Sequence, residues 1–154
     1  MSIESVKAFV ATHAPIYTSA IHGIAHWDRV WEFGQSIGWA EDADLEVVQY
    51  FAYLHDCQRW DDGKDLEHGP RAARFTREVR ELIDLSADQF HLLVRAISGH
   101  TFAMPGSRAG EDPTLATCWD ADRLDIGRVG IHVDPKYLFT DMAKELCALG
   151  NSQG

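Results

Sequence analysis

The spacing of apolar residues is the feature that most restricts how this chain can fold. Apolar side chains recur every three or four residues along nearly every periodic stretch, rather than at every second residue. Residues at that spacing share one face of an α-helix, whereas strict alternation indicates a strand. The sequence therefore predicts an all-α fold, a single compact bundle of about six to seven helices. The expected helices cover residues 3–13, 22–37, 41–59, 68–82, 86–100, 113–129 and 135–149.

Individual residues mark several of these boundaries. Gly38 is placed to end the second helix, and Pro70 suits the first turn of the fourth, where its missing N–H costs nothing. Ser86 and Gln89 form a capping-box pattern at the start of the fifth helix. No signal divides the chain, so we expect one domain over residues 1–150, followed by a polar tail over residues 151–154.

Composition excludes several classes of protein. Hydrophobic residues make up 45% of the 154 residues, which is enough for a buried core. No apolar run approaches the roughly 18 residues of a membrane span, and Glu4 and Lys7 stand where a signal peptide would be apolar. The formal net charge of −10 disfavours a broad face for nucleic acid. We therefore expect a soluble cytoplasmic protein with a small substrate, and neither a membrane nor a nucleic acid polymer as partner.

Histidines stand at unusual positions on the apolar faces. In each of four expected helices, a histidine stands at one end of the apolar stripe. These histidines are His26, His55, His68 and His100. Asp56 follows His55 directly, so one carboxylate lies beside one of these imidazoles. A single histidine at such a position is typical of a hydrogen-bonded core residue, but the coincidence of four favours a shared site.

Asp122 lies inside the apolar stripe of the sixth expected helix, whereas Asp120 falls on a more polar side and is expected to point outward. An unpaired carboxylate in a core costs several kcal/mol, so Asp122 needs a partner. Arg123 or Arg128 would be one kind of partner. A divalent cation would be another, because two neutral imidazoles and two carboxylates balance its charge. The ligands of that cation would be His26, His55, Asp56 and Asp122.

Three segments carry a resemblance to a known family. They are HWDRV with His26, YLHDCQRW with His55 and Asp56, and DADRLD with Asp122. In this order they resemble the HD-domain superfamily of metal-dependent phosphohydrolases, and HGIAHWDRV and WDADRLDIGR are similar to its small stand-alone bacterial members. The resemblance covers residues 22–130 and implies the same four metal ligands. His68 in EHGPRAA and His100 in AISGH resemble histidines that either hold a second metal, with Asp56 bridging, or lie near the substrate phosphate.

The resemblance implies hydrolysis of a nucleotide or another small phosphate ester, either a monoester or a diester. One or two divalent ions would lower the pKa of a bound water; Mn, Fe, Co, Ni, Zn and Mg all suit such ligands. Asp56, His68, His100 and Arg29 are the expected catalytic residues. Arg29, Arg71 and Lys64 are expected to bind the substrate phosphate, and Asp125 to orient a ligand or water.

Two other functions are compatible with the same residues. Dinuclear-iron oxygenases similar to myo-inositol oxygenase use a ligand order that matches His26, His55, Asp56, His68, His100 and Asp122. A catalytically silent binding or regulatory module would keep the fold, although the intact ligand set argues against it. Iron content and oxygen consumption would separate the oxygenase from the hydrolase.

The remaining histidines, the tryptophans and the cysteines are expected to have structural roles. We expect His22 to support the site without being a ligand, and surface or packing positions for His13, His91 and His132. The core or a pocket wall should hold the tryptophans Trp27, Trp31, Trp39, Trp60 and Trp119. Reduced, packed thiols are expected at Cys57, Cys118 and Cys147, which lack CxxC spacing.

Overall fold

Seven α-helices make up most of the computed structural model, which describes residues 2–153 and the side chains of residues 2–150. No strand occurs among these residues, so the all-α prediction is confirmed. Short 3₁₀ segments cover residues 80–82, 109–111, 125–129 and 135–137. The helices are α1 (Ile3–His13), α2 (Ile24–Glu41), α3 (Leu45–Leu54), α4 (His68–Glu78), α5 (Ala87–Gly99), α6 (Pro113–Leu124) and α7 (Asp141–Gln153).

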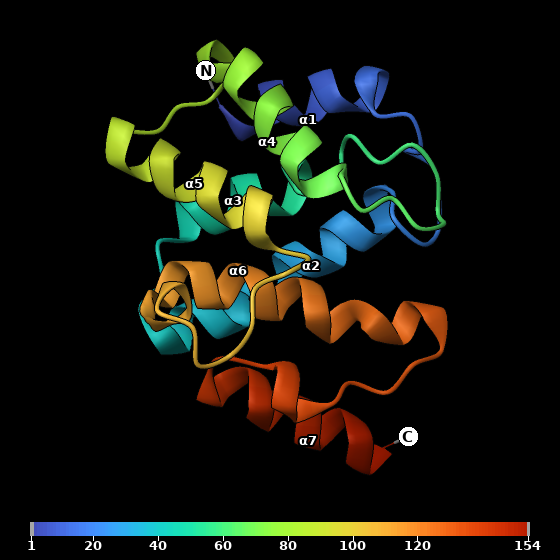
Figure 1. The fold of residues 1–154 in the computed structure, drawn as a ribbon, viewed down its shortest axis with the longest axis vertical. Coiled ribbons are helices and arrows are strands. Elements are labelled where there is room, and N and C mark those ends of the chain that lie inside the picture. The colour runs from blue at the N-terminus through green and yellow to red at the C-terminus, as the bar shows by residue number, and fades with distance from the viewer. Residues whose placement is uncertain (1, 154) are drawn as a thin grey trace.

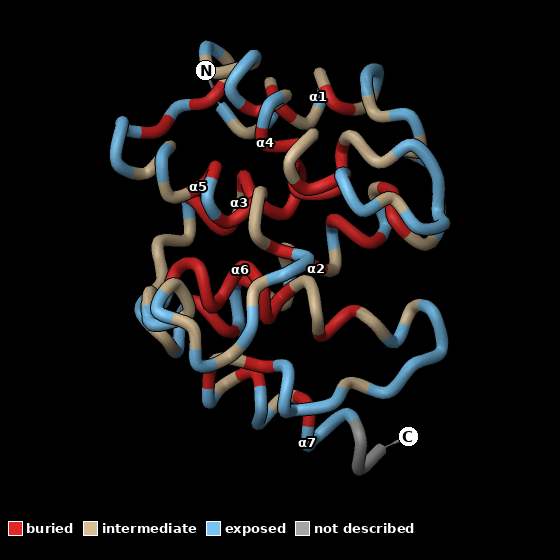
Figure 2. The backbone as a smooth tube through the Cα atoms, in the orientation of Figure 1, coloured by how far each residue is buried: buried red, intermediate tan, exposed pale blue. Residues whose placement is uncertain are grey.

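Helix α2 lies at the centre of the bundle, packed against both α3 and α6. Helix α4 packs on α5, and α5 in turn on α3. Figure 1 shows α1 and α4 at one end of the molecule and α7 at the other. The buried backbone in Figure 2 runs mainly through α3, α6 and the facing sides of α2 and α5. This arrangement brings segments distant in the sequence together in the interior.

Helix α2 passes through Gly38 and ends at Glu41, so the prediction that Gly38 stops it is wrong. A Cβ at Gly38 would lie 2.6 Å from a methyl carbon of Leu45, and one at Gly34 would lie 2.5 Å from a methyl carbon of Val48. Both glycines therefore allow α3 to approach α2 closely. The helix stops instead at Asp42, which adopts the left-handed conformation with φ 57°.

Other helix ends differ from the predicted ones. The Ser86–Gln89 capping box is present at α5. Helix α3 starts only after Asp44, whose carboxylate caps it, and ends at Leu54 rather than near residue 59. Helix α6 gives way to a 3₁₀ segment after Leu124. Helix α7 begins at Asp141 and continues to Gln153, so the region expected as a polar tail is helical that far, and residue 154 lies outside the described residues.

Asp120 is fully buried, which contradicts the expectation that it points outward. Its carboxylate accepts hydrogen bonds from the backbone N–H of Phe139 at 2.9 Å, from the N–H of Thr140 at 2.7 Å, and from the Thr140 hydroxyl at 2.8 Å. Burial raises the pKa of this carboxyl, while these hydrogen bonds favour its ionised form. The side chain therefore fixes the segment before α7, and its three hydrogen bonds offset part of the cost of its burial.

The tryptophans divide between core and surface. Trp27 and Trp119 are buried and Trp31 is partly buried, as expected, but Trp39 and Trp60 are exposed. The three cysteines are buried and form no disulfide within the described residues, as predicted. None of the described helices combines the length and apolarity that crossing a bilayer requires.

Candidate metal centre

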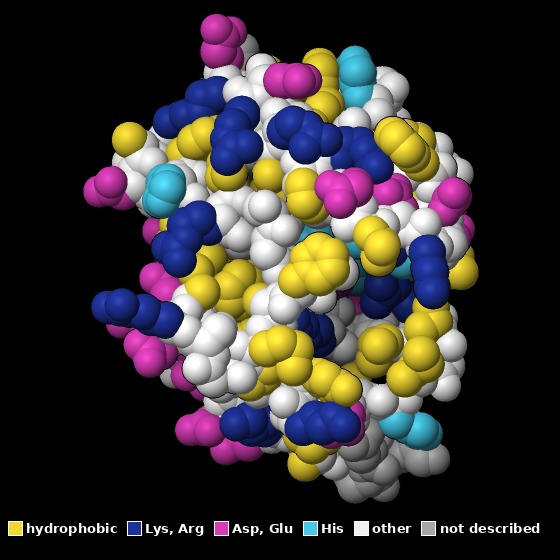
Figure 3. All heavy atoms as spheres, in the orientation of Figure 1, with side chains coloured by type: hydrophobic (Ala, Val, Ile, Leu, Met, Phe, Trp, Pro, Cys, Tyr) yellow, Lys and Arg dark blue, Asp and Glu magenta, His cyan; other side chains and the backbone are white. Residues whose placement is uncertain are grey.

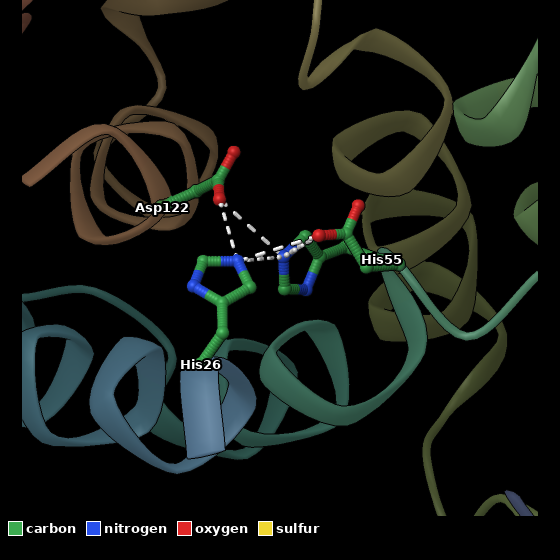
Figure 4. Close-up of side chains that lie close together, drawn as sticks. His26, His55 and Asp122 are labelled. Atoms are coloured by element: carbon green, nitrogen blue, oxygen red, sulfur yellow. Dashed lines mark hydrogen bonds and ion pairs between the residues drawn. The ribbon is translucent and has the colours of Figure 1, made fainter. Parts of the chain in front are cut away.

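The first ligand group consists of His26, His55, Asp56 and Asp122. His26 lies in the first turn of α2, His55 and Asp56 directly follow α3, and Asp122 lies in the last turn of α6. Figure 4 shows His26, His55 and Asp122 pointing toward one another from these three segments. The sequence prediction that these side chains share one site therefore agrees with their positions.

The donor atoms of this group have the spacing of a coordination sphere. His26 Nε2 lies 3.2 Å from His55 Nε2, 3.3 Å from Asp56 Oδ2 and 3.1 Å from Asp122 Oδ1. His55 Nε2 lies 3.5 Å from Asp56 Oδ2 and 3.4 Å from Asp122 Oδ1. Ligand atoms about 2.1 Å from a tetrahedral ion are about 3.4 Å from one another. These distances suit one ion held by all four residues.

The second ligand group consists of Asp56, His68 and His100. His68 is the first residue of α4 and His100 directly follows α5. Asp56 Oδ1 lies 3.2 Å from His68 Nε2 and 3.5 Å from His100 Nε2, and the two nitrogens are 2.9 Å apart. Asp56 therefore turns one oxygen toward each group.

The outer nitrogen of each histidine is tied to an acceptor. His55 Nδ1 is 3.0 Å from the carbonyl oxygen of Ala52, His68 Nδ1 is 2.5 Å from that of Asp65, and His100 Nδ1 is 2.7 Å from that of Ile97. His26 Nδ1 lies 2.7 Å from the Asp125 carboxylate.

Carbonyl and carboxylate oxygens only accept hydrogen bonds, so each Nδ1 donates to its partner, and a ring that carries no second proton turns an Nε2 lone pair inward. Lone pairs from His26, His55, His68 and His100 thus meet the oxygens of Asp56 and Asp122. Such a set repels itself unless protons or cations lie between its members. Two divalent ions would satisfy all of these atoms, so the residues present fit the metal that the sequence predicts.

Protons take the place of cations where no metal is bound. Burial lowers the pKa of His26, but hydrogen bonds to Asp122, Asp125 and Asp56 outweigh it and raise that pKa to about 10. Burial opposes ionisation of Asp56 and Asp122, yet the neighbouring histidines hold the pKa of both carboxyls well below the usual range. The centre therefore keeps its carboxylates ionised and attracts positive charge.

Asp125 and Arg29 support His26 from outside the group. Asp125 orients the imidazole, as expected, and its other oxygen accepts a hydrogen bond from Arg29 Nε at 2.8 Å. Arg29 does not line the pocket above the centre, so its expected contact with a substrate phosphate has no support in its position. The helical spacing correctly predicted that Arg29 lies near His26 on α2, but its guanidinium donates to Asp125 rather than facing the pocket.

Arg71 and Lys64 also lie away from the pocket. The Arg71 guanidinium donates to both Asp65 oxygens, at 2.8 and 3.0 Å, and lies 3.6 Å from the centre of the Trp60 ring. These contacts hold the loop before α4 and lower the pKa of Asp65 to about 2. Lys64 is an exposed residue of that loop. The predicted phosphate contacts of both residues are therefore not supported.

A pocket of about 220 Å³, called the metal pocket below, opens over the two groups. No carboxylate lies within 4 Å of the guanidinium groups of Arg59, Arg123 and Arg128 among the described residues, and the Nε of Arg59 is buried without a hydrogen-bond partner. The pocket is lined by His22, Asp56, Arg59, His68, His100, Thr101, Asp122, Arg123, Ile126 and Arg128.

Sequence reasoning missed these arginines as candidate phosphate ligands. Neither Arg123 nor Arg128 forms an ion pair with Asp122. Arg123 instead donates a hydrogen bond to the carbonyl oxygen of Tyr137 at 2.8 Å, and Arg128 donates one to that of Ile21 at 2.6 Å. The signal that would have found them is proximity, because all three arginines lie within the quoted segments YLHDCQRW and WDADRLDIGR.

The remaining histidines lie outside both groups. His22 lines the metal pocket, with Nδ1 2.8 Å from Asp62, which fits the expected supporting role. Burial outweighs this hydrogen bond and lowers the pKa of His22. His13, His91 and His132 are exposed, as expected.

Comparison with known proteins supports the fold. No family model and no curated protein matches the sequence. Among solved structures, the chain is similar to a predicted HD superfamily hydrolase from an uncultured Thermotogales bacterium, with 24% identity and a TM-score of 0.76 over 97% of this chain and 85% of that one. A likeness at this identity establishes architecture. The chain therefore has the fold of that structure, which agrees with the architecture that the resemblance of its three motifs implied.

Proposed function

We propose that the protein is a metal-dependent phosphohydrolase acting on a nucleotide or another small phosphate ester. One observation carries this proposal. Inward-facing histidine nitrogens and carboxylates form the floor of a pocket whose wall holds Arg59, Arg123 and Arg128 without carboxylate partners. Guanidinium groups that form no ion pair and lie beside a cation site suit an anionic substrate with several oxygens.

We assign the two ligand groups to two divalent ions. His26, His55, Asp56 and Asp122 would hold the first, and Asp56, His68 and His100 the second. Metal ions so held would supply Lewis acidity toward a phosphoryl oxygen and a water of lowered pKa. Asp56 belongs to both groups, which makes it the residue on which the proposed centre most depends.

The protein's own residues would bind and orient the phosphate. Arg59 offers a buried Nε with no partner, and Arg123 and Arg128 keep donors that their backbone acceptors do not use. Local positive charge in the pocket would thereby overcome the net charge of −10 of the whole chain. Asp125 would hold the His26 ring in place as the substrate binds.

The similar solved structure is described as a predicted hydrolase, which supports this reaction class. A dinuclear-iron oxygenase would use the same six ligands, but the pocket arginines favour a phosphate over a neutral substrate. A silent module is less consistent with the arrangement, because all six ligands are present and converge.

The test is phosphate release from a panel of nucleotides and simple phosphate esters, with Mn²⁺, Co²⁺, Ni²⁺, Zn²⁺, Fe²⁺ or Mg²⁺ added. We expect activity in the wild type and none in Asp56→Asn. Asp42→Asn is the matched control, because Asp42 is exposed at the far end of α2 and asparagine tolerates its left-handed conformation. Full activity in Asp56→Asn would contradict the proposal, and oxygen consumption by an iron-loaded protein would favour the oxygenase.

A further inference from the structure

A second, larger pocket adjoins the metal pocket. It has a volume of about 510 Å³, and Met104, Ile131, Val133 and Tyr137 supply much of its lining. We call it the apolar pocket. Its wall comes from the loop after α5 and from the segment between α6 and α7. None of these residues has a role in the proposed reaction.

The side chains of this pocket are unusually open to water. Met104 is 52% exposed, Ile131 54% and Tyr137 44%. Single exposed apolar residues are common, but a group of them around one concavity indicates a binding surface. Figure 3 shows hydrophobic side chains gathered around a hollow in this face, in which histidine and basic side chains are visible.

The two pockets share Thr101, Arg123 and Ile126. Arg123 donates hydrogen bonds to the carbonyl oxygens of Tyr137 and Ala103, so its guanidinium ties together the two walls of the apolar pocket. The same side chain faces the metal pocket. A molecule bound with its phosphate at the arginines would therefore extend past Arg123 into the apolar pocket.

The volumes and linings of the two pockets indicate which part of such a molecule the apolar pocket would hold. The metal pocket, at about 220 Å³, is smaller than the usual small-molecule site, whereas the apolar pocket, at about 510 Å³, lies within the usual range. Its aliphatic and tyrosyl side chains suit a flat ring, and His132 and Asp134, which also line it, suit polar groups at the edge of that ring. We infer that the apolar pocket binds an aromatic group carried by the phosphate ester. This inference rests on the proposed function for the position of the phosphate.

Equilibrium binding of two unreactive probes tests the inference without turnover. We would measure the affinity of the Mn²⁺-loaded protein for 1-naphthylmethylphosphonate and for methylphosphonate by calorimetry. We expect the naphthyl compound to bind about tenfold or more tightly than the methyl compound, because its ring would leave water. The double variant Ile131→Ala/Tyr137→Ala should lose most of this difference while binding methylphosphonate with unchanged affinity.

Trp39→Ala is the matched control, because Trp39 is an 84% exposed aromatic on α2 that lines neither pocket. Its probe affinities should equal those of the wild type. Equal affinities of the wild type for both probes, or an unchanged difference in the double variant, would overturn the inference. So would sedimentation of the wild type as a dimer that the double variant dissociates, because the pocket would then be a subunit interface.

The outcomes also separate this inference from the proposed function. Preferential naphthyl binding that depends on Ile131 and Tyr137, in a protein that hydrolyses no phosphate ester, would support the apolar subsite and contradict the hydrolase. Hydrolysis without any preference for aromatic probes would do the reverse.

Discussion

The two ligand groups resemble each other in their histidines but differ in their carboxylates. The first combines two imidazoles with Asp56 and Asp122, whereas the second has two imidazoles and only the shared Asp56. A divalent ion in the first group would be neutralised by ligands, while one in the second would keep net positive charge. We therefore expect the first ion to bind more tightly, and the second to contribute more to attracting a phosphate.

The hydrogen-bond partners of the ligand histidines also favour tighter binding of the first ion. His26 of the first group rests on the Asp125 carboxylate, whereas His68 and His100 of the second rest on backbone carbonyls. A carboxylate behind an imidazole raises its basicity and its strength as a ligand. Helix ends and their nearby side chains thus make two unequal sites from similar residues.

Asp122→Ala gives the largest expected effect among changes confined to one group. It removes a carboxylate from the first group alone, so the first ion should lose its charge balance and activity should fall about a thousandfold or more. Phosphate release at saturating Mn²⁺ measures this. Wild-type activity in Asp122→Ala would contradict the role of its carboxylate in holding the first ion.

His100→Ala should have a smaller effect. Loss of one imidazole from the second group should remove the weaker ion and lower activity about 10- to 100-fold, while the first ion stays bound. Equilibrium dialysis with Mn²⁺ reports both ions. Simultaneous loss of both ions in His100→Ala would mean that the groups are not separate sites.

Asp125→Asn should weaken the first group without touching its ligands. The amide cannot support His26 as a carboxylate does, so affinity for the first ion should fall about tenfold or more, and the second should be unaffected. Calorimetric titration measures this difference. Arg29→Ala, which leaves the His26–Asp125 contact in place, should have a clearly smaller effect.

Binding of the first ion should strengthen as pH rises. Without metal the pKa of His26 is raised to about 10, so the ring is protonated at neutral pH and must lose that proton to become a ligand. Affinity should therefore increase up to about tenfold per pH unit between pH 6.5 and 8. Calorimetry in buffers of different ionisation enthalpy should show about one proton released. Affinity independent of pH would contradict the protonated state of His26.

Arg71→Ala should have the smallest effect on catalysis. Its guanidinium pairs with Asp65 and stacks on Trp60, outside the metal pocket, so stability should fall by about 1 kcal/mol. Denaturant unfolding measures the loss, and kcat should change less than about twofold. A large loss of activity with unchanged stability would restore Arg71 as a phosphate ligand.

The sequence predicted the ligands better than it predicted the arginines, and the reason is geometric. Helical phase determines which way a side chain leaves its helix, and this alone placed His26, His55 and Asp122 on inward faces. The partner of a long side chain depends on tertiary contacts instead. Arg29 meets Asp125, which is 96 residues away in the sequence, and no local pattern encodes that contact.

Two further errors have the same origin. Asp120 lies on a polar side of α6, but that side is covered by the segment before α7, whose N–H groups bind the carboxylate. Glycine often ends a helix, but Gly38 lies inside α2 and allows α3 to pack closely against it. In both cases the residue's role depends on a neighbour that only the folded chain supplies.

The central claim is that Asp56 joins two metal sites. Elemental analysis by inductively coupled plasma mass spectrometry, on untagged and gently purified wild type, Asp56→Ala and His100→Ala, tests it most directly. We expect two ions per chain in the wild type, one in His100→Ala and none in Asp56→Ala, with unfolding midpoints that show the variants to be folded. Wild-type metal content in folded Asp56→Ala would show that Asp56 does not hold the ions.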